Sequence, residues 1–313
     1  MSKPIVVVGS INLDLVATTE RMPAVGETVA GRAFQTFFGG KGANQAVAIA
    51  RLGYPVHMLG KVGDDAFGSQ LRHALEIAGV SATAVETAPG SSGVAVILTS
   101  NHGENIIVVV AGANGELQAA DLDRHRSLIE DAGLVLTQLE IPMPAVERLA
   151  HITQSVGVPL MLDPSPAQPL SSALLRCLDW ITPNESETRV LLDLDEGEAI
   201  PDVAHRAAEE LLQRGPRNVL LKLGERGVFL ALQNGDRFFV PAYRVEAVDT
   251  TAAGDAFNGA FAVSLIRGKS PKESADYAAA VAAISVTRHG AQPSMPNKDE
   301  VERFLEQQVG GDQ

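Results

Sequence analysis

The chain has 313 residues, 45% of them hydrophobic and 20% charged, which is enough for one large α/β domain and argues against wholesale disorder. Its net charge of −13 disfavours nucleic acid and membrane surfaces as partners, because an acidic surface repels phosphate backbones and anionic lipids. The single cysteine, Cys177, excludes an intramolecular disulfide and fits a reducing compartment. With no apolar stretch of about 20 residues and no signal-peptide pattern, we expect a cytoplasmic protein.

Short apolar runs alternate with helical patterns along the chain. Runs at Ile5–Val8 and 56–59 predict buried strands, and helices are predicted at 42–52 and 67–77, stopping at Gly53 and Gly79. Four more strands are predicted at 134–139, 159–162, 180–182 and 219–223, with helices near 144–155, 185–192 and 203–214. This alternation predicts a three-layer α/β/α fold, in which helices cover both faces of a doubly wound, mostly parallel, Rossmann-like sheet.

Two strand-like runs, at 94–99 and 105–110, interrupt this alternation, and residues 100–104 between them are a predicted hairpin turn. Together with β-rich segments at 13–18 and 27–36, they predict a small separate sheet. It would be inserted at about 12–38 and 92–112 of a single domain spanning residues 1–313. A flap over a cleft is one use for such an insertion. An antiparallel extension of the main sheet is the alternative.

Small residues surround two aspartates in residues 249–259, which read Asp-Thr-Thr-Ala-Ala-Gly-Asp-Ala-Phe-Asn-Gly. A helix is predicted to begin there, and its first amides have no intrahelical partner and carry the positive end of the helix dipole. These amides form an anion site suited to phosphate. Asp255 at the helix start could accept a proton from a substrate hydroxyl, as phosphoryl transfer to an alcohol requires. The alternative for Asp255 is an N-terminal helix cap.

A second glycine-rich segment, residues 38–45, reads Phe-Gly-Gly-Lys-Gly-Ala-Asn-Gln and lacks the spacing of a Walker phosphate loop. Gly40, Lys41 and Asn44 could present amides and side-chain donors to a polyhydroxylated ligand. Asn12 and Asp14 follow the first strand, at the end where open α/β sheets place ligands. This pair suits the binding of sugar hydroxyls, and a solvated loop acid is the alternative for Asp14.

The two segments, in this order and near opposite ends of the chain, resemble those of the ribokinase-like (PfkB) carbohydrate kinases. Further matching stretches cover nearly the whole chain, at residues 9–14, 111–114, 138–140, 182–185 and 288–294. The resemblance implies the ribokinase-like fold and ATP-dependent phosphorylation of D-ribose at its 5-hydroxyl. A relative acting on fructose, deoxyribose or a nucleoside is the enzymatic alternative, and a non-catalytic sugar-binding regulator is the alternative from another class.

The resemblance also implies a role for each matching residue. Asp255 is the implied base, and the amides of Ala252, Ala253 and Gly254 are the implied anion hole for the transferred phosphate. Carboxylate and amide side chains suit a sugar because they bond its hydroxyls and reject analogues that lack them. The implied sugar contacts are Asn12, Asp14, Gly40, Lys41, Asn44, Glu140 and Asp255 itself.

ATP and cation sites are implied in the same way. The implied ATP contacts are Asn184, Lys222, Gly224, Gly227, Gly254 and Ala279; Lys222 stands where relatives commonly have a hydroxyl residue. Glu187 completes an Asn-x-x-Glu pattern that organises Mg²⁺, through water, and an exposed first-turn helix acid is its alternative. The implied K⁺ site comprises Asp249, Thr251, Ser285, Arg288, Gly290 and Ser294, mostly through backbone oxygens. A turn or cap acid is the alternative for Asp249.

Exposed edge strands in the small sheet favour pairing with a second copy of the chain. The resemblance implies a homodimer built on these sheets. The expected ligands are therefore a small sugar, ATP, Mg²⁺ and K⁺, and the expected macromolecular partner is another copy of this chain.

Overall fold

The structure, a computed structural model, describes residues 3–101, 104–194 and 200–310. Its larger sheet has nine strands in the order β13-β12-β11-β10-β9-β8-β1-β4-β5. Neighbours from β11 to β5 pair in parallel, and β12 and β13 pair antiparallel, which confirms the predicted mostly parallel sheet. The strands are β1 (Ile5–Val8), β4 (Val56–Gly63), β5 (Ser81–Ala88), β8 (Leu134–Thr137), β9 (Leu160–Leu162), β10 (Trp180–Ile181), β11 (Asn218–Lys222), β12 (Val228–Leu232) and β13 (Arg237–Val240).

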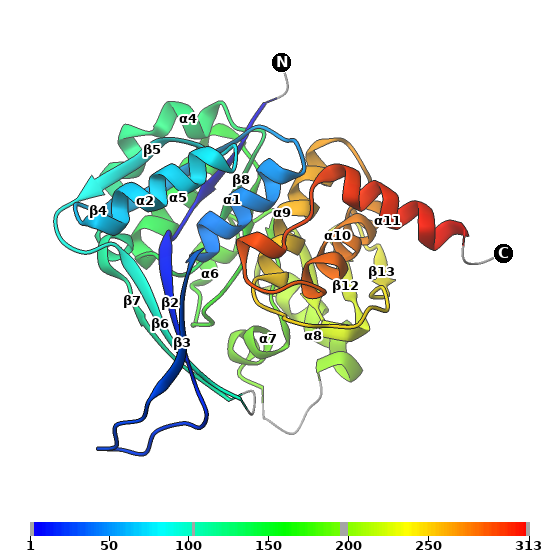
Figure 1. Ribbon diagram of the computed structural model, residues 1–313. Coiled ribbons are helices and arrows are strands. Elements are labelled where there is room, and N and C mark those ends of the chain that lie inside the picture. The colour runs from blue at the N-terminus through cyan, green and yellow to red at the C-terminus, as the bar shows by residue number, and fades with distance from the viewer. Residues whose placement is uncertain (1–2, 102–103, 195–199, 311–313) are drawn as a thin grey trace.

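Helices cover both faces of this sheet (Figure 1). In β1, Ile5 and Val7 pack into one hydrophobic cluster and Val6 and Val8 into the other, because successive side chains of a strand point to opposite faces. The first face is covered by α1 (Lys41–Arg51), α2 (Ala66–Ile77), α9 (Ala253–Ile266), α10 (Pro271–Val286) and α11 (Lys298–Gly310). The second is covered by α3 (Ala119–Arg124), α4 (Arg126–Glu130), α5 (Met143–Val156), α6 (Ser172–Leu175), α7 (Glu185–Leu192) and α8 (Ile200–Arg214). The three-layer prediction is confirmed.

A second sheet of four strands, which we call the lid sheet, has the order β3-β2-β6-β7. Its strands are β2 (Asn12–Thr19), β3 (Gly31–Gly39), β6 (Gly93–Ser100) and β7 (Asn105–Val110). Two antiparallel hairpins, β2–β3 and β6–β7, join through a parallel β2–β6 pair. The lid sheet projects away from the helices (Figure 1). The separate sheet is therefore correct and the extension of the main sheet is wrong; residues 102–103 of the predicted turn lie outside the described residues.

Several element boundaries differ from the sequence-based expectation. The strand predicted at 134–139 ends at Thr137, so residues 138–140 leave the sheet and turn toward its carboxyl edge. Strand β5 was not predicted, because its sequence Ser-Ala-Thr-Ala-Val-Glu-Thr-Ala contains no continuous apolar run. Among the described residues, no helix is long and apolar enough to cross a membrane.

Candidate active site

The predicted site residues gather at the carboxyl edge of the large sheet. Because β1, β8, β9, β10 and β11 are parallel neighbours, the residues that follow them emerge side by side. Backbone hydrogen bonds hold this edge together, from Asp163 N to Thr137 O at 2.9 Å and from Leu139 N to Ser165 O at 2.9 Å. The side chains positioned there include Ser10, Glu140, Asp163, Asn184 and Lys222.

Asp255 lies in the first turn of α9, facing α1. Its Oδ2 accepts from Asn44 Nδ2 at 3.0 Å and its Oδ1 from Gln45 Nε2 at 3.1 Å. The N-cap of α9 is Ala252, so Asp255 is not the capping residue. Burial raises the pKa of the Asp255 carboxyl to about 6, with Lys41 opposing this rise and Asp163 adding to it. The two amides therefore hold this nearly buried carboxylate in a fixed orientation.

Asp14 lies within lid strand β2 rather than in a loop of the large sheet. Its carboxylate packs against the backbone at Gly39, where a Cβ atom would lie 2.4 Å from Oδ2. Burial, followed by the charges of Glu140 and Asp255, raises the pKa of Asp14 to about 7. Asp14 is therefore a lid residue whose carboxyl group lies near enough to Glu140 and Asp255 to be affected by their charges.

Four chain segments connect the lid sheet to the large sheet, and they meet around Asn12. The Asn114 side chain binds the backbone of Ile11, accepting from its N–H at 2.9 Å and donating to its carbonyl at 3.2 Å. Asn114 Nδ2 also donates to Asn12 Oδ1 at 2.7 Å. A Cβ atom at Gly93 would lie 2.1 Å from Asn114 Nδ2, and one at Gly40 would lie 2.7 Å from Asn12 N. Glycine is required at both positions because the segments approach so closely.

Glu140 joins the end of β8 to the start of α1. Its Oε2 accepts from Ser10 Oγ at 2.5 Å and from the backbone N–H of Lys41 at 3.1 Å. Burial lowers the pKa of the Lys41 ammonium, but Asp255, Asp163, Glu140 and Glu187 together raise it above its ordinary value. Lys41 therefore remains charged and is surrounded by carboxylates. Gly40, which precedes it, has a left-handed backbone with φ +87° that favours glycine.

The loop before α9 holds the predicted anion hole. Ala252 has φ +58°, a left-handed conformation that is strained for a residue with a side chain. The Ala253 N–H donates to Thr250 O at 3.2 Å, so one of the three predicted amides is shared with a turn. Lys222 Nζ lies 3.5 Å from the position of a Cβ at Gly254. The loop thus combines amides at the start of a helix with an adjacent ammonium group, a combination that favours phosphate.

On the nucleotide side, Asn184 and Glu187 form a reciprocal cap at the start of α7. Glu187 N donates to Asn184 Oδ1 at 2.9 Å, and Asn184 N donates to Glu187 Oε2 at 2.8 Å. Glu187 is a first-turn acid, but it is buried, so the exposed alternative is wrong. Gly227 has φ +108° and packs against Val240 O, and Gly224 has φ +56°. Ala279 is buried within α10.

The predicted K⁺-site residues come from two stretches of chain that lie together, the loop before α9 and the end of α10 with the segment that follows it. Val248 N and Asp249 N both donate to Val286 O, at 2.7 and 3.1 Å. The Asp249 carboxylate accepts from Thr251 N at 2.9 Å and from Gly290 N at 2.8 Å, so it acts as a turn acid and also joins the loops. Burial raises the pKa of Asp249, but a hydrogen bond from the Thr251 hydroxyl at 2.6 Å and these two backbone hydrogen bonds hold it below its usual value.

The remaining members of that set have side chains turned to other partners. Ser285 Oγ donates to Ala282 O and Ser294 Oγ to Ala291 O, at 2.8 and 2.7 Å. Arg288 pairs with Glu300 at 2.7 Å. Side chains at these three positions therefore shape the loop, and any contribution to a cation comes from their backbone oxygens.

Five residues of the site were not assigned a role from the sequence: Ser10, Gln45, Asn114, Gln138 and Asp163. All five are nearly or fully buried. Asp163 follows a predicted strand at its carboxyl end, which is the same signal that identified Asp14. Gln45 adjoins Asn44 within the glycine-rich segment, but its side-chain partners lie far away in the sequence and could not be read from it.

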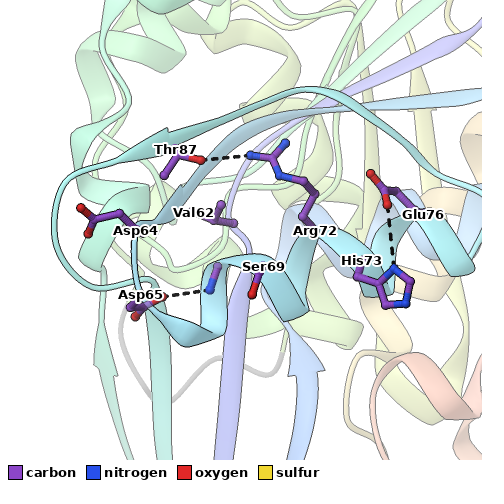
Figure 2. A pocket seen from close by; sticks show the side chains of 10 residues that line it. Val62, Asp64, Asp65, Ser69, Arg72, His73, Glu76 and Thr87 are labelled. Carbon is purple, nitrogen blue, oxygen red and sulfur yellow. Dashed lines mark hydrogen bonds and ion pairs between the residues drawn. The ribbon is translucent and has the colours of Figure 1, made fainter.

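A separate pocket of about 350 Å³ lies at the start of α2 and is lined by residues such as Asp64, Asp65, Arg72 and Thr87 (Figure 2). Arg72 crosses it and donates to Thr87 Oγ1 at 3.3 Å. Asp65 caps α2 through Gly68 N at 2.9 Å and accepts from Ser92 N at 2.9 Å, next to the start of β6. These groups connect α2 to the base of the lid sheet, and none of the predicted site residues lines the pocket.

Comparisons with known proteins agree with this geometry. The model of the pfkB family of carbohydrate kinases matches residues 2–298. The chain is 42% identical to the ribokinase of Schizosaccharomyces pombe, over 95% of this chain and 96% of that protein. It is 37% identical to the deoxyribokinase of Salmonella typhi, over 96% and 98%. The structure of Arabidopsis thaliana ribokinase complexed with ribose and ATP superposes with a TM-score of 0.92 at 36% identity, covering 98% of this chain and 99% of that one. The chain belongs to the pfkB family of carbohydrate kinases.

Proposed function

We propose that this protein is an ATP-dependent sugar kinase that phosphorylates D-ribose at O5, giving D-ribose 5-phosphate and ADP. One observation carries the proposal: the Asp255 carboxylate, held by Asn44 and Gln45, lies in the first turn of α9, next to Gly254 and the ammonium of Lys222. The similarity to ribokinases over almost the whole chain supports ribose as the sugar.

In this proposal, the sugar binds between α1 and the start of lid strand β2, where Asn12 and Asp14 lie. Asn12, Asp14, Lys41, Asn44 and Glu140 offer the amide, ammonium and carboxylate groups that bond hydroxyls, with Gly40 allowing the close approach of the backbone. Asp255, as a carboxylate, accepts the proton of the sugar's 5-hydroxyl. The oxygen of that hydroxyl attacks the γ-phosphate of ATP, and ADP leaves. The amides of Ala252 and Gly254, together with the Ala253 turn, stabilise the transferring phosphoryl group.

ATP would lie along the carboxyl ends of β10 and β11. Asn184 and Lys222 are placed to contact its phosphates, Gly224 and Gly227 allow the backbone to approach the nucleotide, and Ala279 leaves space beside α10 for adenine. Because Lys222 forms an ion pair with Asp163 at 2.9 Å, its ammonium is held at this edge before ATP binds.

The donor groups present fit both proposed cations. Oxygen ligands suit Mg²⁺, which keeps several waters, and the buried Glu187 carboxylate would hold it through water beside Asn184. The loops carrying Asp249, Thr251, Ser285, Arg288, Gly290 and Ser294 are joined by Asp249 and would offer backbone oxygens to K⁺. When bound, Mg²⁺ neutralises phosphate charge and K⁺ adds positive charge next to the anion-hole loop.

The proposal extends to the assembly of the protein. In the lid sheet, all six residues of β7 are exposed, and Ile106–Val110 are about half exposed or more, with Phe34 66% exposed on β3. An edge strand that is apolar on both faces favours burial against a second copy. We propose a homodimer built on the lid sheets, a single kinase domain spanning residues 1–313, and a cytoplasmic location.

A coupled ADP-release assay across D-ribose, 2-deoxy-D-ribose, D-fructose and adenosine tests the function. We expect the highest kcat/KM with D-ribose, and nuclear magnetic resonance should place the phosphate on O5. If 2-deoxy-D-ribose or D-fructose is preferred, the ribose assignment is wrong and the alternative within the family holds. A protein that binds sugar but releases no ADP would instead be the non-catalytic regulator.

A further inference from the structure

We propose that Gln45 is a positioning residue that fixes the Asp255 carboxylate and links it to Asp163 and Lys222. This inference deepens the proposed function, since it concerns the same base. It rests on the contacts of one buried amide, whose residue is fully inaccessible to solvent.

Both N–H groups of the Gln45 amide have a carboxylate acceptor. Nε2 lies 3.1 Å from Asp255 Oδ1 and 3.0 Å from Asp163 Oδ2. A primary amide has two N–H donors, so it can serve both carboxylates at once. Without this amide between them, the carboxylates of Asp255 and Asp163 would repel each other strongly, because the buried site offers little solvent screening.

Gln138 fixes the orientation of this amide. Its Nε2 donates to Gln45 Oε1 at 2.7 Å, so the oxygen of Gln45 is bound on the side away from the two carboxylates. If the Gln45 amide were rotated by about 180°, its oxygen would face the carboxylates of Asp163 and Asp255, and its N–H groups would face the Nε2 donor of Gln138. Only one orientation therefore satisfies the three neighbours.

The far end of the chain of contacts reaches the loop before α9. Asp163 Oδ1 accepts from Lys222 Nζ at 2.9 Å, and Lys222 lies beside Gly254. Lys222, Asp163, Gln45 and Asp255 thus form a continuous, largely buried series of hydrogen bonds that involve charged groups. It connects the place where a phosphate would bind to the group that would accept the proton.

Other charged groups around Asp255 were considered for the same role. Lys41 on α1 and Asp14 on β2 act on it through charge, and Glu140 and Glu187 lie near Lys41. Among the described residues, the hydrogen bonds to the Asp255 carboxylate come from Asn44 and Gln45, and Gln45 alone of these two also contacts Asp163. Gln45 is therefore the residue whose loss should expose Asp255 to the charge of Asp163.

Gln45→Leu removes both donations at similar volume. We expect kcat to fall by about 10-fold to 100-fold, less than the roughly 10²-fold to 10⁴-fold that a general base contributes, because the base itself is still present. The KM for ATP should change less than about 3-fold. The acid limb of the pH profile of kcat/KM should move up by about one pH unit, because the carboxylate loses a donor beside a like charge. Gln138→Leu removes the hydrogen bond to Gln45 Oε1 and leaves the donors to Asp255 in place, so it should shift the acid limb in the same direction by a smaller amount.

A double variant distinguishes a positioning role of Gln45 from a role in packing alone. Adding Asp163→Asn to Gln45→Leu removes the repelling charge, so the acid limb should return toward that of the wild-type protein. Thr153→Val, which removes a buried hydroxyl with a 3.0 Å hydrogen bond within α5, is the matched control for loss of a buried polar group and should leave the limb unmoved. The inference would be overturned if Gln45→Leu left the acid limb at its wild-type pH, or if adding Asp163→Asn did not move the limb back.

A second measurement, of Tm as a function of pH, does not depend on catalysis. It can therefore test the role of Gln45 even if the protein phosphorylates none of the tested sugars. Because Gln45→Leu raises the pKa of Asp255 further above its unfolded value, ionisation at high pH penalises the folded variant more than the wild type. The difference in Tm between the two proteins should therefore grow between about pH 5 and about pH 8. A constant difference would refute the role of Gln45, whereas an inactive wild-type protein showing the growing difference would refute only the proposed function.

Discussion

The side-chain amide of Asn114 donates to the side-chain oxygen of Asn12, with 2.7 Å between Nδ2 and Oδ1. Asn114 lies where the lid sheet returns to the main domain, and Asn12 lies where the chain first enters the lid sheet. One amide therefore joins the first and last crossings, which places the lid residues Asn12 and Asp14 relative to the large sheet.

Asn114→Ala should weaken sugar binding more than ATP binding. The change leaves the Ile11 backbone and Asn12 Oδ1 without their partner, which costs about 1–3 kcal/mol of unfolding free energy for buried groups. We expect KM for the sugar to rise by about 10-fold, equivalent to about 1.4 kcal/mol, and KM for ATP to stay within about 2-fold. Steady-state kinetics with each substrate varied measures this. Asn234→Ala, in an exposed turn, is the control, and an equal rise of both KM values would contradict the prediction.

Activity should fall on the acid side as Asp255 takes up a proton. With its pKa raised to about 6, Asp255 is protonated and unable to act as a base at lower pH. The kcat/KM for the sugar, which reports the protein without bound sugar, should therefore rise with pH and reach half its plateau near pH 6. Asp14, with a pKa of about 7, could add a second limb, so the profile is also recorded for Asp14→Asn, in which the limb near pH 6 should persist. A plateau extending down to about pH 4, the ordinary range of a carboxyl, would contradict the assignment.

Removing the Asp249 carboxylate should impair activation by K⁺. In Asp249→Ala, the loops carrying Thr251 and Gly290 lose the acceptor that holds them together. We expect the K⁺ concentration for half-maximal activity to rise by about 10-fold or more, since a charge-assisted contact is worth about 1.5–3 kcal/mol. A KCl titration at constant ionic strength measures this, with Asp236→Ala, in a surface turn, as control. Unchanged K⁺ activation would place the cation elsewhere.

Ala252→Gly should separate stability from activity. Ala252 adopts a left-handed backbone, which costs a residue with a Cβ about 1 kcal/mol and costs glycine almost nothing. Relief of this strain offsets the greater freedom of glycine in the unfolded chain, so the unfolding free energy should change by less than about 1 kcal/mol. The more flexible loop should lower kcat severalfold. A loss of stability well beyond that range in urea unfolding would show that Ala252 is not strained.

Much of the fold could be predicted from the sequence, because buried parallel strands such as β1 are continuous aliphatic runs. Strand β5 was missed because its exposed edge position allows Thr and Glu among small residues. The apolar run of β12 was present in the sequence, but nothing local shows that it pairs antiparallel with β11.

The candidate site divides in the same way. Residues within glycine-rich segments, such as Asn44 and Asp255, were identifiable because glycine and small residues mark close approach. The partnership of Gln45 with Asp163 and Gln138 was not, because it joins residues 118 and 93 positions apart in the sequence. The lid position of Asp14 likewise depends on pairing with β3 and β6, which is a long-range property.

The most direct test of the central claim is single-turnover phosphoryl transfer by Asp255→Asn, with sugar binding measured separately by calorimetry. Asparagine keeps the volume of the side chain but cannot accept the hydroxyl proton. We expect the transfer rate to fall by about 10²-fold to 10⁴-fold, as loss of a general base predicts, while the Kd for D-ribose changes less than about 5-fold. Transfer at a rate near that of the wild-type protein, with sugar binding intact, would show that Asp255 is not the base.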